Sequence, residues 1–218
     1  MMKTLTIHRT PSTLSPEDIH ALSQFMDTLE KQPIDKINWK DFPEKPEVHF
    51  TIAWDPGHII LKYFVREPVI RARFSEDNSP VWQDSCAEFF VAPGDDGMYY
   101  NFETNCIGTC LAEKGFSRSP REKLPPPLLA HIKRYPSLGV APFEEKTGDF
   151  SWDLLLVIPK EVFTDHSIDT FEGKTFRANF YKIGDDLSRK HYLTWHPVKT
   201  PEPDYHRPEF FGKIKFSS

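Results

Sequence analysis

The pattern of hydrophobic positions begins with a helical period. Ser15 is a suitable N-cap, and Pro16 suits the first position of a helix. Four apolar residues then follow at positions i, i+3, i+7 and i+10, which places them on one helix face. These residues are Ile19, Leu22, Met26 and Leu29. The pattern predicts one helix over residues 15–31, whose apolar face covers part of a sheet.

From residue 48 onward the period changes to two, which is typical of β-strands. Residues 48–54 and 59–65 flank the turn sequence Asp-Pro-Gly-His, so they predict a hairpin. Residues 86–91 and 99–105 flank a turn rich in glycine and aspartate, and they predict a second hairpin.

The rest of the chain adds short strands and one long irregular stretch. Residues 117–148 are rich in proline and charge, with a single helical turn expected near 128–135. We expect this stretch to form a long excursion on the surface. The remaining strand-like runs are 150–158, 174–183, 191–195 and 212–216.

Short strands separated by turn signals, with almost no helix, predict an all-β fold. The expected architecture is a two-sheet antiparallel β-sandwich preceded by a helix. We assign residues 1–33 to an N-terminal extension that contains the helix and residues 34–218 to the sandwich.

Composition and charge narrow the function classes. The 218 residues contain 27 Lys and Arg against 32 Asp and Glu, a net charge of −5. Nucleic-acid binding would need clustered basic residues, so we expect no nucleic-acid partner. No stretch of about 18 apolar residues exists, so we expect no membrane span. The first residues lack the apolar core of a secretory signal, which favours the cytoplasm.

Cysteine and acidic residues offer few metal sites. Cys86, Cys106 and Cys110 are an odd number in a long chain, so we expect buried, reduced thiols rather than a disulfide framework. The spacing of the cysteines and histidines matches no strong zinc pattern. The acidic turns at 95–96 and 185–186 can hold Ca²⁺ or serve as ordinary turns, and the sequence leaves both open.

Polar and aromatic residues share one face of several predicted strands. Tryptophan, tyrosine, asparagine and arginine together are unusual for a solvated face, and they suit a small-molecule site. On three strands, the residues expected to share a side are Trp82, Asp84 and Glu88; Tyr99, Asn101, Glu103 and Asn105; and Arg177, Asn179 and Tyr181.

Glu88 and Glu103 fall on the same face if the second hairpin pairs around its turn. Two carboxyls about 5–9 Å apart are what glycoside hydrolysis uses. The same pair can instead accept hydrogen bonds from sugar hydroxyls, or bind an ion or an arginine such as Arg177. These alternatives remain open from the sequence.

Four segments carry a resemblance to a known family. They are Val81–Phe90, Tyr99–Thr109, Thr194–Pro197 and Asp204–Ile214. The chain resembles the family 9 carbohydrate-binding modules, in particular the stand-alone bacterial proteins of this type. The resemblance extends from Ile34 to Phe216.

This resemblance implies an immunoglobulin-like β-sandwich that binds carbohydrate without catalysis. The family holds a terminal sugar between two aromatic rings; Trp82 matches one ring, and Tyr205 falls where the other is usually tryptophan. Glu88 matches the acid that hydrogen-bonds the sugar. The family also carries structural calcium, whose ligands we do not place here. Further candidate helpers are Asn101, Glu103 and Arg177.

Two other function classes compete with sugar binding. The first is a glycoside-processing enzyme that uses Glu88 and Glu103 as an acid–base pair. The second is a protein-interaction sandwich that docks a partner through residues 117–148.

Overall fold

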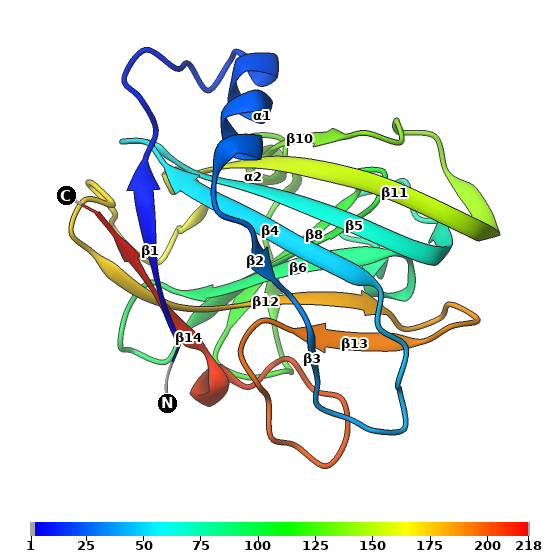
Figure 1. Cartoon of the computed structure of the whole chain (residues 1–218). Coiled ribbons are helices and arrows are strands. Elements are labelled where there is room, and N and C mark those ends of the chain that lie inside the picture. The colour runs from blue at the N-terminus through cyan, green and yellow to red at the C-terminus, as the bar shows by residue number, and fades with distance from the viewer. Residues whose placement is uncertain (1–2, 218) are drawn as a thin grey trace.

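The computed structural model describes residues 3–217, and they form two facing β-sheets (Figure 1). The first sheet contains β2 (Gln32–Pro33), β4 (Glu47–Trp54), β5 (His58–Ala72), β10 (Lys133–Pro136) and β11 (Phe143–Pro159). The second contains β3 (Lys36–Ile37), β6 (Cys86–Ala92), β7 (Tyr99–Asn105), β8 (Cys110–Gly115), β9 (Glu122–Lys123), β12 (Thr175–Gly184), β13 (His191–Thr194) and β14 (Gly212–Phe216). The predicted all-β sandwich with an N-terminal helix is therefore confirmed.

One strand that the sequence pattern did not predict connects the two sheets. The first four residues of β1 (Thr4–Arg9) pair with β14, and its last two residues pair with β4. Both pairings are parallel, whereas the other strand pairs are antiparallel. Residues near the N-terminus thus contribute hydrogen bonds to both sheets.

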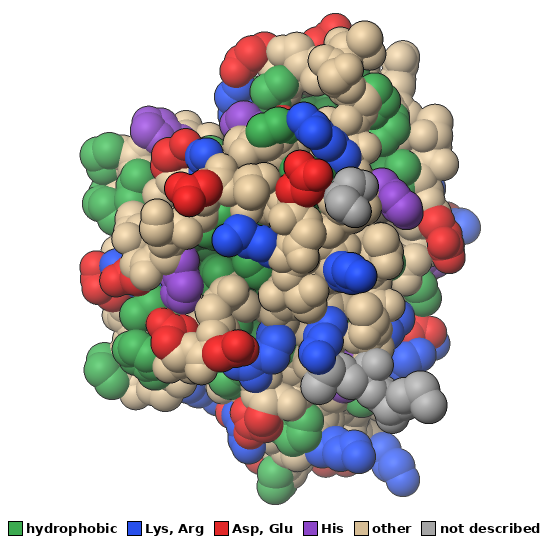
Figure 2. Space-filling model, turned by 90° about the vertical axis from the view of Figure 1, so that its left-hand side faces the viewer, with side chains coloured by type: hydrophobic (Ala, Val, Ile, Leu, Met, Phe, Trp, Pro, Cys, Tyr) green, Lys and Arg blue, Asp and Glu red, His purple; other side chains and the backbone are tan. Residues whose placement is uncertain are grey.

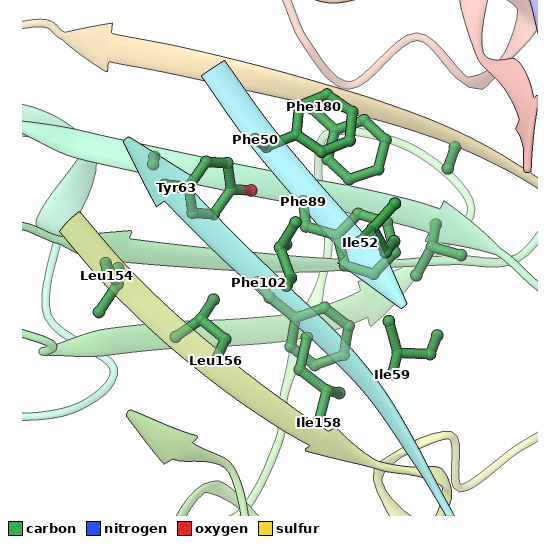
Figure 3. Packing of buried hydrophobic residues seen from close by; sticks show 14 of the residues in the cluster. Phe50, Ile52, Ile59, Tyr63, Phe89, Phe102, Leu154, Leu156, Ile158 and Phe180 are labelled. Atoms are coloured by element: carbon green, nitrogen blue, oxygen red, sulfur yellow. The ribbon is translucent and has the colours of Figure 1, made fainter. Parts of the chain in front are cut away.

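The space between the sheets is filled by stacked aromatic rings. Phe180 of the second sheet lies 3.8 Å from Phe50 of the first, measured between ring centroids, and 5.0 Å from Phe89 (Figure 3). Phe89 in turn stacks on Phe102 of the neighbouring strand. Because side chains alternate along a strand, Glu88 and Phe90 face outward on either side of the buried Phe89.

A separate apolar cluster covers the outer face of the second sheet. It combines outward-facing strand residues with residues from the segments around 39–42 and 198–211. These segments pack against the sheet and cover part of its outer face, so that face is not fully exposed to solvent. The cluster includes Trp39, Phe90, Tyr99, Tyr181, Tyr192, Tyr205 and Phe211.

The outer face of the first sheet is covered by the helix α1 (Ile19–Thr28). Leu22 and Met26 are buried against Ala53, Ile60 and Leu155, as the helical period predicted. Four very short helical segments follow in the described residues: the 3₁₀ turns η1 (Val81–Gln83), η2 (Lys160–Val162) and η3 (Pro208–Phe210), and the helix α2 (Pro126–Leu129). In the described part of the chain, no helix combines the length and hydrophobicity that crossing a membrane requires.

The predicted start of α1 was wrong. Its N-cap is Asp18, whose carboxylate accepts a hydrogen bond from the Ala21 backbone N–H at 3.0 Å. Ser15 instead accepts from the Glu17 N–H within a turn that precedes the helix. The first helical residue is Ile19, so Pro16 lies outside the helix, which ends at Thr28 rather than residue 31.

We expect Asp18→Ala to lower the free energy of unfolding by about 1 kcal/mol, because an N-cap side chain satisfies a helical N–H that otherwise has no partner. Ser15→Ala is the matched control and is expected to cost less. Urea unfolding of the two variants checks this, and a larger loss for Ser15→Ala would contradict the assignment.

The Pro-rich segment is more ordered than predicted. Residues 143–148 belong to β11, and β10 pairs with the other end of that long strand. Leu124, Leu129 and Ile132 are buried in the core between the sheets. The helical turn predicted near 128–135 lies earlier, as α2 at Pro126–Leu129, and β10 (Lys133–Pro136) occupies the end of the predicted range. The segment therefore contributes to the core and to the first sheet, in addition to forming surface loops.

The predicted strand over residues 59–65 extends to Ala72 as β5. This continuation passes through Pro68, although proline cannot donate a hydrogen bond to a sheet. The pairing with β11 accommodates it through a register shift between Thr147 and Phe150. β-Bulges and register shifts are the usual place for such a proline.

The surface around β1 and β14 carries mixed charge. In Figure 2, which views the molecule from that side, basic and acidic side chains are interspersed with scattered hydrophobic ones.

Cys86, Cys106 and Cys110 are all buried, and none of them forms a disulfide within residues 3–217. Burial raises the pKa of each thiol, to about 12 for Cys110.

Candidate functional site

A cavity of about 500 Å³ opens on the outer face of the second sheet. Its base is formed by β6, β7, β8 and β12, and its walls by residues from the 115–121 and 196–207 segments. Aromatic and charged side chains dominate the lining. The aromatic ones are Phe42, Trp82, Phe90, Tyr192 and Tyr205, and the charged ones are Glu88, Glu103, Glu113, Arg118, Arg121, Asp185 and Asp204.

Glu88 and Glu103 lie at the base of this cavity. They are directly opposite each other in the register of β6 and β7, as the predicted hairpin required. Their exposed fractions are only 2% and 4%. Asn101 donates a hydrogen bond to Glu103 Oε1 at 2.9 Å, while Glu103 Oε2 has no partner among residues 3–217.

Burial raises the pKa of both carboxyls. The pKa of Glu88 lies well above its usual range because of burial and, secondly, the nearby charge of Glu103. The pKa of Glu103 is raised by burial to about 8, although the hydrogen bond from Asn101 opposes the shift. At neutral pH the pair therefore retains protons that exposed carboxyls would have lost.

These shifts have a consequence for stability. A carboxyl with a raised pKa in the folded state favours folding most below its unfolded pKa, and this contribution falls as pH rises toward the folded value. Glu103→Gln removes the titration and keeps an acceptor for Asn101. We expect the melting temperature of this variant, relative to wild type, to rise between pH 5 and pH 8. Each kcal/mol of unfolding free energy that wild type loses over this range corresponds to about 2–4 °C. Parallel thermal unfolding of both proteins across this range checks it; a constant difference would contradict the buried titration.

Arg121 is a residue of the site that sequence analysis missed. Its guanidinium lies 4.2 Å from the ring centroid of Tyr99. Its Nε and Nη2 donate to Asn101 Oδ1 at 3.0 and 2.7 Å. Asn101 is fully buried and donates to Glu103, so Arg121 and Asn101 together position the Glu103 carboxyl. The Pro-rich sequence around Arg121 gave no local signal of this long-range contact.

Trp82 is half-buried in the 3₁₀ turn η1 and lines the cavity. Its backbone carbonyl accepts a hydrogen bond from the Asp185 N–H at 3.2 Å, and Gln83 is held similarly by Asp186. The turn is thus fixed to the segment after β12, while the exposed part of the indole ring is available for contact with a ligand.

Tyr205 also lines the cavity but is almost fully buried. Its ring stacks on Tyr181 with a centroid distance of 4.0 Å and an interplanar angle of 8°. Its hydroxyl donates to the backbone carbonyls of Lys182 and Leu193. Tyr205 is therefore a fixed part of the wall. Phe42 and Tyr192, which were not predicted, form an edge-to-face pair at 4.7 Å that also lines the cavity.

The predicted shared faces are only partly realised. Asp84 is fully buried beneath η1 and binds Arg71 and backbone N–H groups rather than pointing into the cavity. Asn105 donates to Asp84 and does not line the cavity either. For Asp84 the 3₁₀ turn η1 explains the difference, because it interrupts the strand alternation just before β6.

Two polar residues of β12 also lie outside the cavity lining. Arg177 Nη1 is 3.4 Å from the Pro208 carbonyl, to which it donates. Asn179 Nδ2 donates to the His196 carbonyl, and Asn179 Oδ1 accepts from the His196 N–H. These side chains share the outer face of the sheet, as predicted, but they secure the segment after β13 instead.

Carboxylates of the acidic turns have partners within the chain. Asp185 accepts a hydrogen bond from the Tyr192 hydroxyl, and Asp186 pairs with Arg71. Asp96 accepts from the Met98 N–H within its own turn. Among residues 3–217, no three His, Cys, Asp or Glu side chains converge as metal ligands. The calcium expected from the family resemblance stays a prediction.

The chain is thus a β-sandwich with a cavity on one sheet that aromatic and acidic side chains line. The model of carbohydrate-binding family 9 matches residues 19–216, so the chain belongs to that family. The match includes α1, which the sequence resemblance had left outside.

Solved structures give the same result for the fold. A protein of Bacteroides uniformis described as a candidate carbohydrate-binding protein is 43% identical, with a TM-score of 0.95, over 99% of this chain and 100% of that one. Family 9 modules of Caldicellulosiruptor kristjanssonii, in complex with cellotriose and with glucose, are 13% identical. The cellotriose complex has a TM-score of 0.59, and the match covers 99% of this chain and 94% of that one. The glucose complex has a TM-score of 0.56, and the match covers 98% of this chain and 95% of that one. No curated protein matches the chain significantly.

Proposed function

We propose that the protein binds carbohydrate without catalysis, in the cavity on the second sheet. The observation that carries this is the placement of half-buried Trp82 and the buried carboxyls Glu88 and Glu103 in the lining of one cavity. The glucose and cellotriose complexes of the Caldicellulosiruptor modules, which share the fold, support the same ligand class.

The chemistry of the lining suits a sugar ring. Aromatic faces cover the apolar C–H side of a pyranose, while carboxyl and amide groups bind its hydroxyls. A cavity of about 500 Å³ lies within the range of small-molecule sites, about 300–1,000 Å³. We assign stacking on the sugar ring to Trp82 and hydrogen bonding of its hydroxyls to Glu88 and Glu103. Tyr205 forms part of the cavity wall. Asn101 acts by positioning Glu103.

Isothermal titration calorimetry with a panel of monosaccharides and oligosaccharides tests the proposal. Saturable binding of at least one sugar by the full chain, with one site per molecule, is the expected result. The titrations are repeated with calcium added, because the family resemblance implies that ion. Absence of binding across the panel under both conditions would overturn the proposal.

Glycoside hydrolysis is the second candidate function, favoured by the raised pKa of Glu88, which suits a general acid. Hydrolysis also requires an ionised base or nucleophile. Glu103, with its pKa raised to about 8, fills that role poorly at neutral pH. Release of nitrophenol from aryl glycosides, abolished by Glu88→Gln, would establish the enzyme; binding without turnover supports the module.

A further inference from the structure

The cavity holds more acidic than basic side chains. Its two most buried carboxyls, Glu88 and Glu103, have no ion-pair partner among residues 3–217. The nearest cations are engaged elsewhere. Arg121 pairs with Glu113 at 3.7 Å and donates to Asn101. Lys182 faces the other side of the sheet, where it pairs with Glu67 at 2.8 Å.

We propose that the ligand of this cavity is an amino sugar whose protonated amine lies between Glu88 and Glu103. The inference rests on the proposed carbohydrate-binding function and narrows its ligand class. Directly opposite residues of paired strands have Cβ atoms about 4.5–5.5 Å apart, so one ammonium group can contact both carboxyls. It would also supply the donor that Glu103 Oε2 lacks.

An organic cation fits the surroundings better than a metal ion. Two carboxyls alone are a small ligand set for calcium, and no third acidic, histidine or cysteine side chain within residues 3–217 completes it. Aromatic rings line the same cavity, with Trp82 the most suited to attract a cation and to stack on a sugar.

The protonation of the pair separates amino sugars from neutral ones. Burial raises the pKa of Glu103 to about 8, so at neutral pH a neutral sugar meets a pair that still holds protons. An ammonium group stabilises the ionised carboxyl and displaces a proton to the buffer. Binding of an amino sugar should therefore release a proton, whereas binding of the parent sugar should not.

The test compares glucosamine and galactosamine with glucose, galactose and the two N-acetyl derivatives, by calorimetry at pH 7 in buffers of different ionisation enthalpy. We expect the free amine to bind at least about tenfold more tightly than the parent sugar, as a charge-assisted hydrogen bond allows. The apparent binding enthalpy should vary with the buffer for the amines alone. The N-acetyl sugars should show no gain over the parents.

Matched variants locate the effect. Glu103→Gln should reduce the ratio of amine to parent affinity to near one, while Asp149→Asn, an exposed carboxylate on the first sheet, should keep the wild-type ratio. Equal binding of amines and parent sugars without proton release would overturn the inference and leave the carbohydrate-binding function standing. Binding of none of these sugars, nor of their oligomers, would overturn both.

Discussion

Replacing Asp84 with alanine is expected to lower the free energy of unfolding by about 3–5 kcal/mol, the usual cost of removing one partner of a buried ion pair. Asp84 is fully buried, and it pairs with Arg71, whose side chain is only 6% exposed. It also accepts hydrogen bonds from the backbone of Arg73 and Phe74 and from the Asn105 amide. Alanine leaves the Arg71 Nε and the backbone N–H groups of Arg73 and Phe74 without this acceptor inside the sandwich.

Urea unfolding of Asp84→Ala beside Asp149→Ala provides the measurement. Asp149 pairs with Arg66, but both side chains are more than half exposed, so its removal should leave the unfolding midpoint unchanged. Similar midpoints for the two variants would show that the Asp84 network does not stabilise the fold. Because Asp84 follows η1, we also expect its loss to disturb Trp82.

Replacing Trp82 with alanine is expected to weaken sugar binding by about 2 kcal/mol or more, which is about thirtyfold in Kd. The ring supplies an aromatic surface that is only half-buried before the ligand binds, so truncation removes contact area without opening a cavity in the core. Titration calorimetry with the tightest sugar of the panel measures the change.

The control for Trp82→Ala is Phe116→Ala. Phe116 is another exposed aromatic residue, 61% exposed, at the hairpin beside the cavity, and it does not line the cavity. We expect this variant to bind like wild type. Equal loss in both variants, or no loss in Trp82→Ala, would exclude stacking on the indole ring as the main contact.

The parts of the site that the sequence predicted depend on local pattern. A period of two on either side of a short turn placed Glu88 opposite Glu103, and the observed register agrees. The hairpin from β4 to β5 follows the same logic, since the Asp55 carboxylate accepts the backbone N–H groups of Gly57 and His58. Turn chemistry and alternation require only neighbouring residues, so a single sequence suffices.

The parts that the sequence did not predict depend on distant partners. β1 is a short run whose pairing residues belong to β4 and to β14. Arg121 gains its role only when β9 brings it beside Tyr99 and Asn101. Lys182 occupies an inward-facing position that favours an apolar residue, and its partner Glu67 lies in the part of β5 beyond the predicted strand.

The position of β1 has a consequence for how the chain reaches its folded state. β1 precedes every other strand, yet four of its residues pair only with β14, which follows every other strand. The ribosome must therefore synthesise the chain as far as β14 before the junction between the sheets can close. Contacts of such wide sequence separation form slowly, since the loop entropy is lost before the contact is gained. Until then the free edges of β4 and β14 are open to other strands, so closure of this seam protects the newly made protein from aggregation.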